Sequence, residues 1–176
     1  MEMLNRLDDY DRKLFSKVCR QSKSRLTGIL AGALSRSGEG AMHALIPLAI
    51  WQLQLPGFKE IATLIPLSFA LERGLHWSLK NSLKRPRPQN AIPGLHSLGK
   101  ASNQFSFPSG HSSRAFLLAT TLVVVYGIPA LVMYPWAAAV ALSRVVLGVH
   151  YPGDALAGAL TGSGVALFGA TLLGLL

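Results

Sequence analysis

Long apolar segments with few charges alternate with shorter polar ones along most of this chain. The apolar segments cover residues 40–54, 58–79, 109–126, 129–149 and 152–175. A helix over residues 58–79 would be about 33 Å long at 1.5 Å per residue, enough to cross the hydrocarbon core of a bilayer. Gly127 and Pro129 predict a tight turn between the third and fourth segments. We therefore expect an all-α fold, a multi-pass transmembrane helical bundle of five to six spans.

The N-terminal part of the chain has a different pattern. Residues 26–35 are apolar and rich in small residues but short, which favours an interfacial or re-entrant piece. Within residues 1–25, apolar residues fall on one helical stripe and basic residues lie elsewhere; the stripe is formed by Leu7, Tyr10, Leu14 and Val18. This predicts an N-terminal amphipathic interfacial helix, with a helix packed on its own protein as the alternative. We divide the chain into this basic segment, residues 1–25, and a transmembrane domain, residues 26–176.

The composition fits a membrane protein. Of the 176 residues, 50% are hydrophobic and 14% are charged, whereas roughly a quarter of the residues of soluble domains are charged. The formal net charge is +9, and we expect it to face membrane lipids. No nucleic-acid partner is expected, because nucleic-acid binders carry their basic residues on a polar, soluble framework. The single cysteine, Cys19, excludes an internal disulfide and a cysteine-based metal site.

The order of the spans brings distant polar residues to one face. If each span crosses the membrane once, the end of residues 58–79 emerges beside the start of 109–126, the end of 129–149 and the start of 152–175. The polar residues at these four places are Lys80, Lys84, Arg85, Arg87, Ser109, Gly110, His111, Arg114, Ser143, Arg144, His150 and Asp154. We therefore expect them to form a single pocket at the membrane surface.

The residue types in this pocket suit a phosphate ester. Lys80, Arg87 and Arg144 are cations that bind phosphate oxygens, and a helix that begins near Ser109 and Gly110 adds a hydroxyl and backbone N–H groups. His150 and Asp154 are four residues apart, so the carboxylate can hold one ring nitrogen while the other attacks phosphorus. His111 is then placed to protonate the leaving oxygen.

Two other chemistries fit the pocket less well. Ser109 could act as the nucleophile with His111 as its base, but the surrounding residues lack the Gly-x-Ser-x-Gly elbow of serine hydrolases. A zinc site would have only two histidines and one acid, beside cations that repel a divalent ion. We therefore predict neither a metal nor any other cofactor.

These residues resemble the three-part signature of the type 2 phosphatidic acid phosphatase family. Its first part, Lys-x6-Arg-Pro, matches residues 80–88; its second, Pro-Ser-Gly-His, matches residues 108–111; its third, Ser-Arg-x5-His-x3-Asp, matches residues 143–154. The resemblance implies that His150 is a nucleophile that becomes phosphohistidine, that Asp154 orients it and that His111 is the acid. It also implies metal-independent hydrolysis, with the phosphate held by Lys80, Arg87, Ser109, Gly110 and Arg144.

The function expected from these features is that of an integral membrane lipid phosphatase. It would remove a terminal phosphate from a phosphate or pyrophosphate lipid through a phosphohistidine intermediate. Undecaprenyl pyrophosphate, phosphatidylglycerophosphate and phosphatidic acid all fit, and the size of the chain resembles that of bacterial undecaprenyl pyrophosphate phosphatases. The alternative is a non-catalytic protein that binds or transports anionic lipids with the same basic pocket.

The side of the membrane that the pocket faces depends on which signal dominates. The positive-inside bias would place the basic face in the cytoplasm. The resemblance to bacterial family members favours the outer, periplasmic-type face of an inner membrane, and this is the expectation we adopt.

Three further residue patterns suggest specific contacts. Gly158 and Gly162 form a small-residue face that favours close helix packing. Glu72 and His76 have the spacing of partners on one helix. Lys84 and Arg85 are expected to contact lipid headgroups or to flank their span as positive residues.

Overall fold

The computed structural model describes residues 2–21, 24–95, 97–99 and 103–176. Helices make up most of the fold, and the described part of the chain contains no β-strand, only an isolated bridge between Pro86 and Phe105. The helices are α1 (Glu2–Gln21), α2 (Arg25–Ser37), α3 (Ala41–Gln52), α4 (Phe58–Leu83), α5 (Pro88–Ala91), α6 (Gly110–Tyr126), the 3-10 helix η1 (Ile128–Val132), α7 (Met133–Val146) and α8 (Pro152–Leu172). The expected all-α architecture is confirmed.

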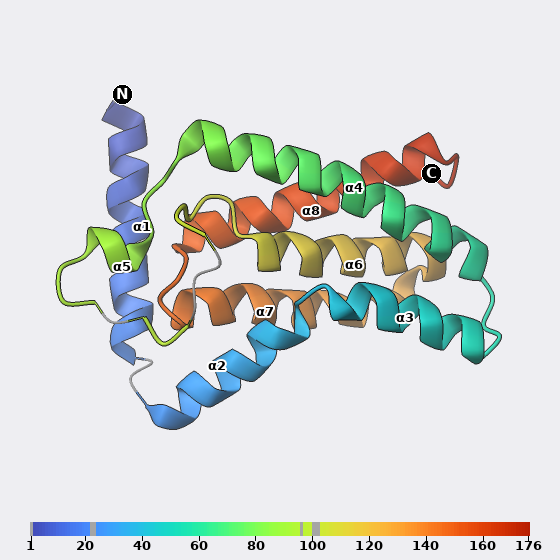
Figure 1. Ribbon diagram of the computed structural model, residues 1–176, viewed down its shortest axis with the longest axis horizontal. Helices are drawn as coiled ribbons and strands as arrows, with labels where there is room; N and C mark the ends of the chain where they lie inside the picture. The colour runs from blue at the N-terminus through green and yellow to red at the C-terminus, as the bar shows by residue number, and fades with distance from the viewer. Residues whose placement is uncertain (1, 22–23, 96, 100–102) are drawn as a thin grey trace.

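Helix α6 lies at the centre of the bundle. It packs against α4, α7 and α8, and these four helices run side by side in Figure 1. Two helical segments, Ile128–Val146 and Pro152–Leu172, are long and apolar enough to cross a membrane. Helix α4 is longer, but its apolar sequence is interrupted by Glu72, Arg73 and Lys80. The count of five to six spans therefore stays a prediction.

Residues 24–52 form two successive helices. Helix α2 begins at the cap residue Ser24, whose hydroxyl accepts the Thr27 N–H, and packs against α7 with Ala31 and Ser35 buried. The chain then turns at residues 38–40 into α3, which packs against α4. At 12 residues α3 would reach only about 18 Å as an isolated helix. Residues 26–35, expected to be interfacial or re-entrant, lie within α2, and their place relative to a membrane stays a prediction.

The N-terminal helix α1 lies across one end of the bundle (Figure 1). One of its faces packs on α7 and α8: Phe15 is 1% exposed, its ring meets the ring of Tyr151, and Val18 and Cys19 contact the same cluster. Tyr10 and Leu14 remain exposed on another face. The packing on α7 and α8 agrees with a helix packed on its own protein. The exposed apolar side chains agree with an interfacial helix, so both alternatives for α1 remain open.

The contact between α6 and α8 depends on glycine. A Cβ at Gly158 would overlap the carbonyl oxygen of Ser109, and one at Gly162 would overlap that of Ser113. Close approach of the two backbones is possible only because these positions lack a side chain. The glycine pair predicted from the sequence is thus a helix-packing face, and it sets the distance between α8 and the start of α6.

Substituting Gly162 tests this packing. We expect Gly162→Ala to push α8 away from α6 and to destabilise the protein by about 1–3 kcal/mol, as overpacked cores do. Thermal unfolding in detergent measures the loss. Gly164→Ala is the matched control, because nothing lies within 4 Å of a Cβ at that position of the same helix. Equal melting temperatures for the two variants would contradict the packing argument.

Candidate active site

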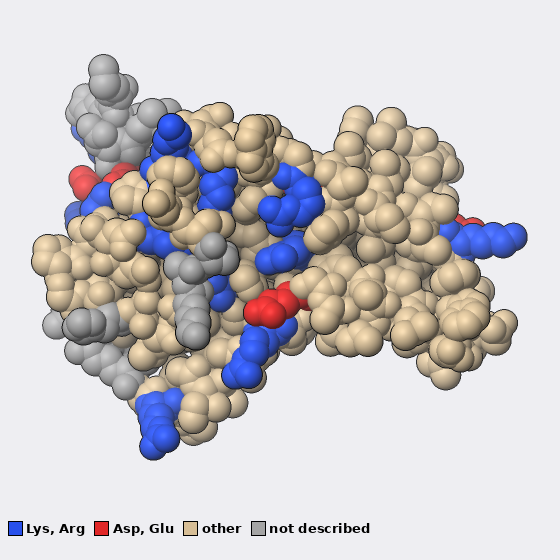
Figure 2. All heavy atoms as spheres, in the orientation of Figure 1, with Lys and Arg blue, Asp and Glu red and all other residues tan. Residues whose placement is uncertain are grey.

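Four helix ends meet at the end of the bundle that α1 crosses. The C-terminal ends of α4 and α7 lie there beside the N-terminal ends of α6 and α8 (Figure 1). Figure 2 shows that Lys and Arg side chains gather on this half of the visible face, whereas most of the opposite half is uncharged. The convergence expected from the span order is therefore what the fold produces.

His150 and Asp154 are positioned by the start of α8. Pro152 occupies the first turn of this helix, and Asp154 Oδ2 accepts the backbone N–H of Tyr151 at 2.9 Å, as in a capping box. His150 precedes this cap, with Nδ1 3.7 Å from Asp154 Oδ2. Its Nε2 lies 3.4 Å from Nη1 of Arg87. One ring nitrogen thus faces a carboxylate and the other faces a cation.

Arg87 is fixed by the loop that follows α4. Its backbone is extended, as is usual before a proline, and α5 begins at Pro88. The guanidinium is 1% exposed and donates to the backbone carbonyl and side-chain oxygens of Asn103 and to the carbonyl oxygen of Val149. The same loop is held by the Ser106 N–H, which donates to the Arg85 carbonyl at 2.8 Å. These bonds set the position of Arg87 before any ligand arrives.

The first turn of α6 packs against the same group. Ser109 caps the helix, with its hydroxyl accepting from the N–H and the hydroxyl of Ser112, and its own N–H donates to the Asp154 carbonyl at 2.9 Å. A Cβ at Gly110 would lie 3.1 Å from the His76 ring, so α6 approaches α4 closely here. The Ser109 hydroxyl is therefore buried and acts as the cap of α6.

The two remaining predicted cations reach the site from opposite helices. Lys80 of α4 has its Nζ 3.5 Å from Nε2 of His76, whose Nδ1 lies 3.6 Å from Oε1 of Glu72. Arg144 of α7 donates to the Ser35 hydroxyl of α2, and its Nε has no hydrogen-bond partner among the described residues. Both side chains are at least nine-tenths buried. The Glu72–His76 pair expected from spacing is therefore present. His76 in turn lies beside Lys80, so the three side chains form a row along α4.

His111 is the second residue of α6. Its Nε2 lies 3.7 Å from a carboxylate oxygen of Glu39, which comes from the turn between α2 and α3. No pattern in the sequence predicts Glu39 at this position, because the turn meets α6 only through the tertiary fold. Ser143, by contrast, bonds the Val140 carbonyl on its own helix.

Comparison with known proteins identifies the family. A model of the PAP2 superfamily matches residues 61–174, most of the chain and all three motifs. The chain belongs to the PAP2 superfamily. It is also 31% identical over 125 residues to a lipid A 4'-phosphatase of Bacteroides thetaiotaomicron, a match that covers 69% of this chain but only 56% of that relative.

Two solved structures share the fold of this PAP2 protein. The crystal structure of Aquifex aeolicus LpxE is 27% identical, with a TM-score of 0.76 over 90% of this chain and 93% of the other. A transmembrane PAP2-type phosphatidylglycerolphosphate phosphatase from Bacillus subtilis is 22% identical, with a TM-score of 0.76 over 97% and 87% of the two chains. The likeness shows that this chain has the fold of these two PAP2-type proteins.

Arg85 was expected on this face of the bundle, but the sequence assigned it no part in the catalytic group. It was expected to contact lipid headgroups, but its Nη1 donates to Asp154 Oδ1 at 2.8 Å. Its neighbour Lys84 ends α4 in the left-handed conformation and is exposed, so the expectation remains a prediction for Lys84 alone. A second arginine two residues before Arg87 was the available signal in the sequence, but only the fold shows its partner.

The electrostatic setting of His150 predicts an unusual pH dependence. Burial lowers the pKa of this imidazole to about 4, although Asp154 opposes the shift. If His150 is the nucleophile of a phosphatase, it must be neutral to react, so kcat/KM should stay high as the pH falls through 6.5 and decline only near pH 4 to 5. Rates with two lipid substrates would be measured from pH 4 to 8.

Comparing two substrates shows whether the pH effect comes from a group of the enzyme or from the phosphate of the lipid. A decline caused by His150 stays at the same pH for both substrates, whereas one caused by titration of the phosphate moves with the substrate. Reversal of the decline on return to neutral pH excludes unfolding. A common midpoint near 6.5 would contradict the effect of burial on the His150 pKa.

Proposed function

We propose that this PAP2 protein is an integral membrane lipid phosphatase that removes a terminal phosphate through a phosphohistidine at His150. One observation carries the proposal. The His150 ring lies between Asp154 on its Nδ1 side and Arg87 on its Nε2 side. A nucleophilic imidazole needs this arrangement. The Asp154 carboxylate orients the ring through Nδ1, and Nε2 is left to attack a phosphate whose negative charge is attracted by Arg87.

The first step transfers the phosphoryl group to the enzyme. Nε2 of His150 attacks phosphorus, and the bond from phosphorus to the lipid oxygen, or to the β-phosphate oxygen of a pyrophosphate, breaks. Lys80, Arg87 and Arg144 stabilise the charge on the phosphoryl oxygens. At the N-terminal turn of α6, Gly110 adds a backbone N–H and Ser109 adds its hydroxyl, because the Ser109 N–H is held by the Asp154 carbonyl. His111 gives its proton to the leaving oxygen.

The second step releases inorganic phosphate. Water attacks the phosphohistidine, His111 takes the proton of that water, and the bond between phosphorus and Nε2 breaks. Asp154 stabilises the positive charge that His150 carries while it is phosphorylated. No metal is assigned a part in either step, since buried cations surround the phosphate position in this scheme.

The substrate class follows from where the site lies. A pocket at the end of the bundle lets a phosphorylated headgroup enter while its acyl or prenyl chains remain in the bilayer. Undecaprenyl pyrophosphate, phosphatidylglycerophosphate and phosphatidic acid are the candidates, the first preferred for a chain of this size. We further propose that the protein resides in a bacterial inner membrane with five to six spans and its active site on the periplasmic face.

Phosphate release from purified lipids tests the function. The protein in detergent or in liposomes should release phosphate from at least one of these three lipids or from lipid A, without added metal and in the presence of a chelator. Brief reaction with a 32P-labelled substrate followed by denaturation should leave a label on the protein that is labile to acid and stable to base. Absence of both release and label across the panel would reject the proposal.

The alternative function, non-catalytic binding or transport of anionic lipids, makes a different prediction. Such a protein needs the cations Lys80, Arg87 and Arg144 but has no use for a His150–Asp154 pair. It would bind the labelled lipid without forming an acid-labile adduct. The trapping experiment therefore distinguishes the two functions directly.

A further inference from the structure

The catalytic carboxylate proposed above is bonded on its second oxygen to a residue outside the three motifs. Asp154 is fully buried, and its Oδ1 accepts from Nη1 of Arg85 at 2.8 Å. The same Nη1 donates to Asp11 Oδ2 at 2.7 Å, and Nη2 donates to Asp8 Oδ1 at 2.6 Å. Arg85 thus joins a carboxylate of α8 to two carboxylates of the N-terminal helix α1.

The packing of α1 against the start of α8 makes this bridge possible. Asp11 Oδ1 accepts the Gly153 N–H at 2.7 Å, at the positive end of the α8 dipole. A Cβ at Gly153 would lie 2.7 Å from Asp11 Oδ2, so the glycine is what allows Asp11 to come this close. Phe15 and Tyr151 pack edge to face beside these bonds. The position of α1 is therefore set next to Asp154 by both polar and apolar contacts.

Arginine suits this position for geometric and electrostatic reasons. Its planar fork serves several carboxylate oxygens at fixed angles, and its face lies 4.1 Å from the centre of the Tyr151 ring. Burial opposes its charge, but Asp154, Asp11 and Asp8 together raise the pKa of Arg85, which keeps it cationic. A lysine could keep the charge but could not span the same oxygens.

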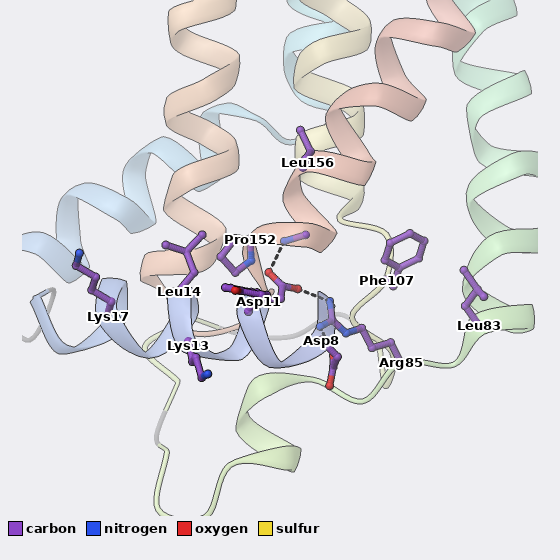
Figure 3. A pocket seen from close by; sticks show the side chains of 12 residues that line it. Asp8, Asp11, Lys13, Leu14, Lys17, Leu83, Arg85, Phe107, Pro152 and Leu156 are labelled. Atoms are coloured by element: carbon purple, nitrogen blue, oxygen red, sulfur yellow. Dashed lines mark hydrogen bonds and ion pairs between the residues drawn. The ribbon is translucent and has the colours of Figure 1, made fainter. Parts of the chain in front are cut away.

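Asp8, Asp11 and Arg85 are among the residues that line a cavity of about 1270 Å³. Figure 3 shows these three side chains next to one another among the lining residues. The cavity lies between α1 and the neighbouring ends of α4 and α8, represented by Leu83 and Leu156. The side chains that connect α1 to Asp154, which are Asp8, Asp11 and Arg85, are thus partly exposed on the surface of this cavity and are not enclosed in the core. Substitution there changes the bridge without opening a hole in the bundle.

From these contacts we propose that Arg85 is a positioning residue of the active site, and that the N-terminal helix acts on catalysis through Asp11, Asp8 and Arg85. The inference rests on the function proposed above. Oδ2 of Asp154 accepts the Tyr151 N–H and lies near His150. The bond from Arg85 to Oδ1 therefore fixes the plane of the carboxylate. Arg85 itself does not touch the phosphate in this scheme.

Loss of the bridge should slow catalysis without weakening substrate binding. We expect Arg85→Gln to lower kcat about 10- to 100-fold with KM changed less than about threefold, since removing the partner of a functional ligand has effects of this size. Arg85→Lys should recover part of the rate. Asp11→Asn should lower kcat about 3- to 10-fold, because an amide oxygen still accepts one of the bonds.

A double-mutant cycle tests whether α1 acts through Arg85. In the Arg85→Gln background, Asp11→Asn should have less than a twofold further effect, because the bridge is already broken. Gly153→Ala should reproduce the Asp11→Asn defect without changing any charge. Asp9→Asn on the same helix is the control, since its side chain is exposed and it should retain the normal rate. Additive effects of the two substitutions would overturn the role assigned to α1.

A measurement that needs no turnover tests the Arg85 bridge separately from the proposed function. Removing the positive charge of Arg85 leaves Asp154 a stronger partner for His150, so the pKa of His150, followed by NMR of a ring-labelled protein, should rise in Arg85→Gln. The other groups around His150 remain unchanged; they are Asp154, Arg87, Arg144, His76 and His111. Arg85→Lys should leave that pKa close to its normal value.

The outcomes separate the two hypotheses. Normal kcat and an unchanged His150 pKa in Arg85→Gln would overturn the positioning role even if the protein is a lipid phosphatase. A His150 pKa that rises in a protein with no phosphatase activity would support the bridge and reject the function. A lower melting temperature with normal kcat and normal His150 pKa would show that Arg85 only anchors α1, and would also overturn the inference.

Discussion

Replacing His150 with alanine is expected to remove phosphatase activity, by at least about 10⁴-fold in kcat, because His150 is the nucleophile of the proposed mechanism. The His150 ring is 2% exposed and is the group between Arg87 and Asp154. The measurement is phosphate release from the lipid that the intact protein prefers. The acid-labile label on the protein should disappear in the same variant.

A folded but inactive protein is the required control for this variant. His150→Ala should remain extractable in detergent, and it should still bind the lipid substrate, because Lys80, Arg87 and Arg144 are unchanged. Its melting temperature should be within a few degrees of that of the intact protein. Retained turnover, or a label that persists on the variant, would show that the nucleophile lies elsewhere.

Replacing His111 with asparagine is expected to produce a loss that depends on the leaving group. For a lipid phosphate, whose alkoxide leaves poorly, kcat should fall about 10²- to 10⁴-fold, since proton transfer to the leaving oxygen contributes about that much. For an aryl phosphate such as p-nitrophenyl phosphate, which leaves without a proton, the fall should be less than about tenfold. Parallel rates with the two substrates give the ratio.

Lys80→Ala is the matched comparison for the His111 variant. Lys80 is assigned to the phosphate itself, which is the same in both substrates, so this variant should slow both by a similar factor. A His111→Asn protein that slows both substrates equally would mean that His111 holds the phosphate. In that case the proton donor would have to be another group, and Glu39, 3.7 Å from the His111 ring, is the nearest acid.

Much of the fold was predictable because its signals are local. Apolar segments of sufficient length, separated by glycine, proline and charged residues, predicted the helices and their order. The convergence of four helix ends followed from counting crossings, and the spacing of His150 and Asp154 predicted their pairing on one turn. The same spacing rule predicted Glu72 beside His76, and small residues at 158 and 162 predicted the close contact of α8. These features need no knowledge of which helices become neighbours beyond the order of the chain.

The boundaries and the neighbours of the short N-terminal helices were less predictable. The apolar segment 26–35 is too short to span a bilayer and is rich in small residues. It nevertheless forms a helix that packs on α7, and its Ser35 hydroxyl accepts a hydrogen bond from Arg144. The stripe of α1 predicted an apolar face, but Phe15 rather than Leu14 or Tyr10 is the side chain buried against Tyr151. Amphipathic patterns give a face, and the packing partner decides which part of that face is covered.

The sequence by itself determined the family, the helical bundle and the set of residues proposed for catalysis, because hydropathy and motif spacing are properties of single segments. Only the tertiary structure decided that Arg85 meets Asp154 and that carboxylates of the N-terminal helix hold it, residues separated by 69 positions or more. It also decided that Glu39 lies beside His111. Such contacts depend on how whole helices dock, and docking arises from complementary shape and charge summed over many residues, which no local pattern encodes.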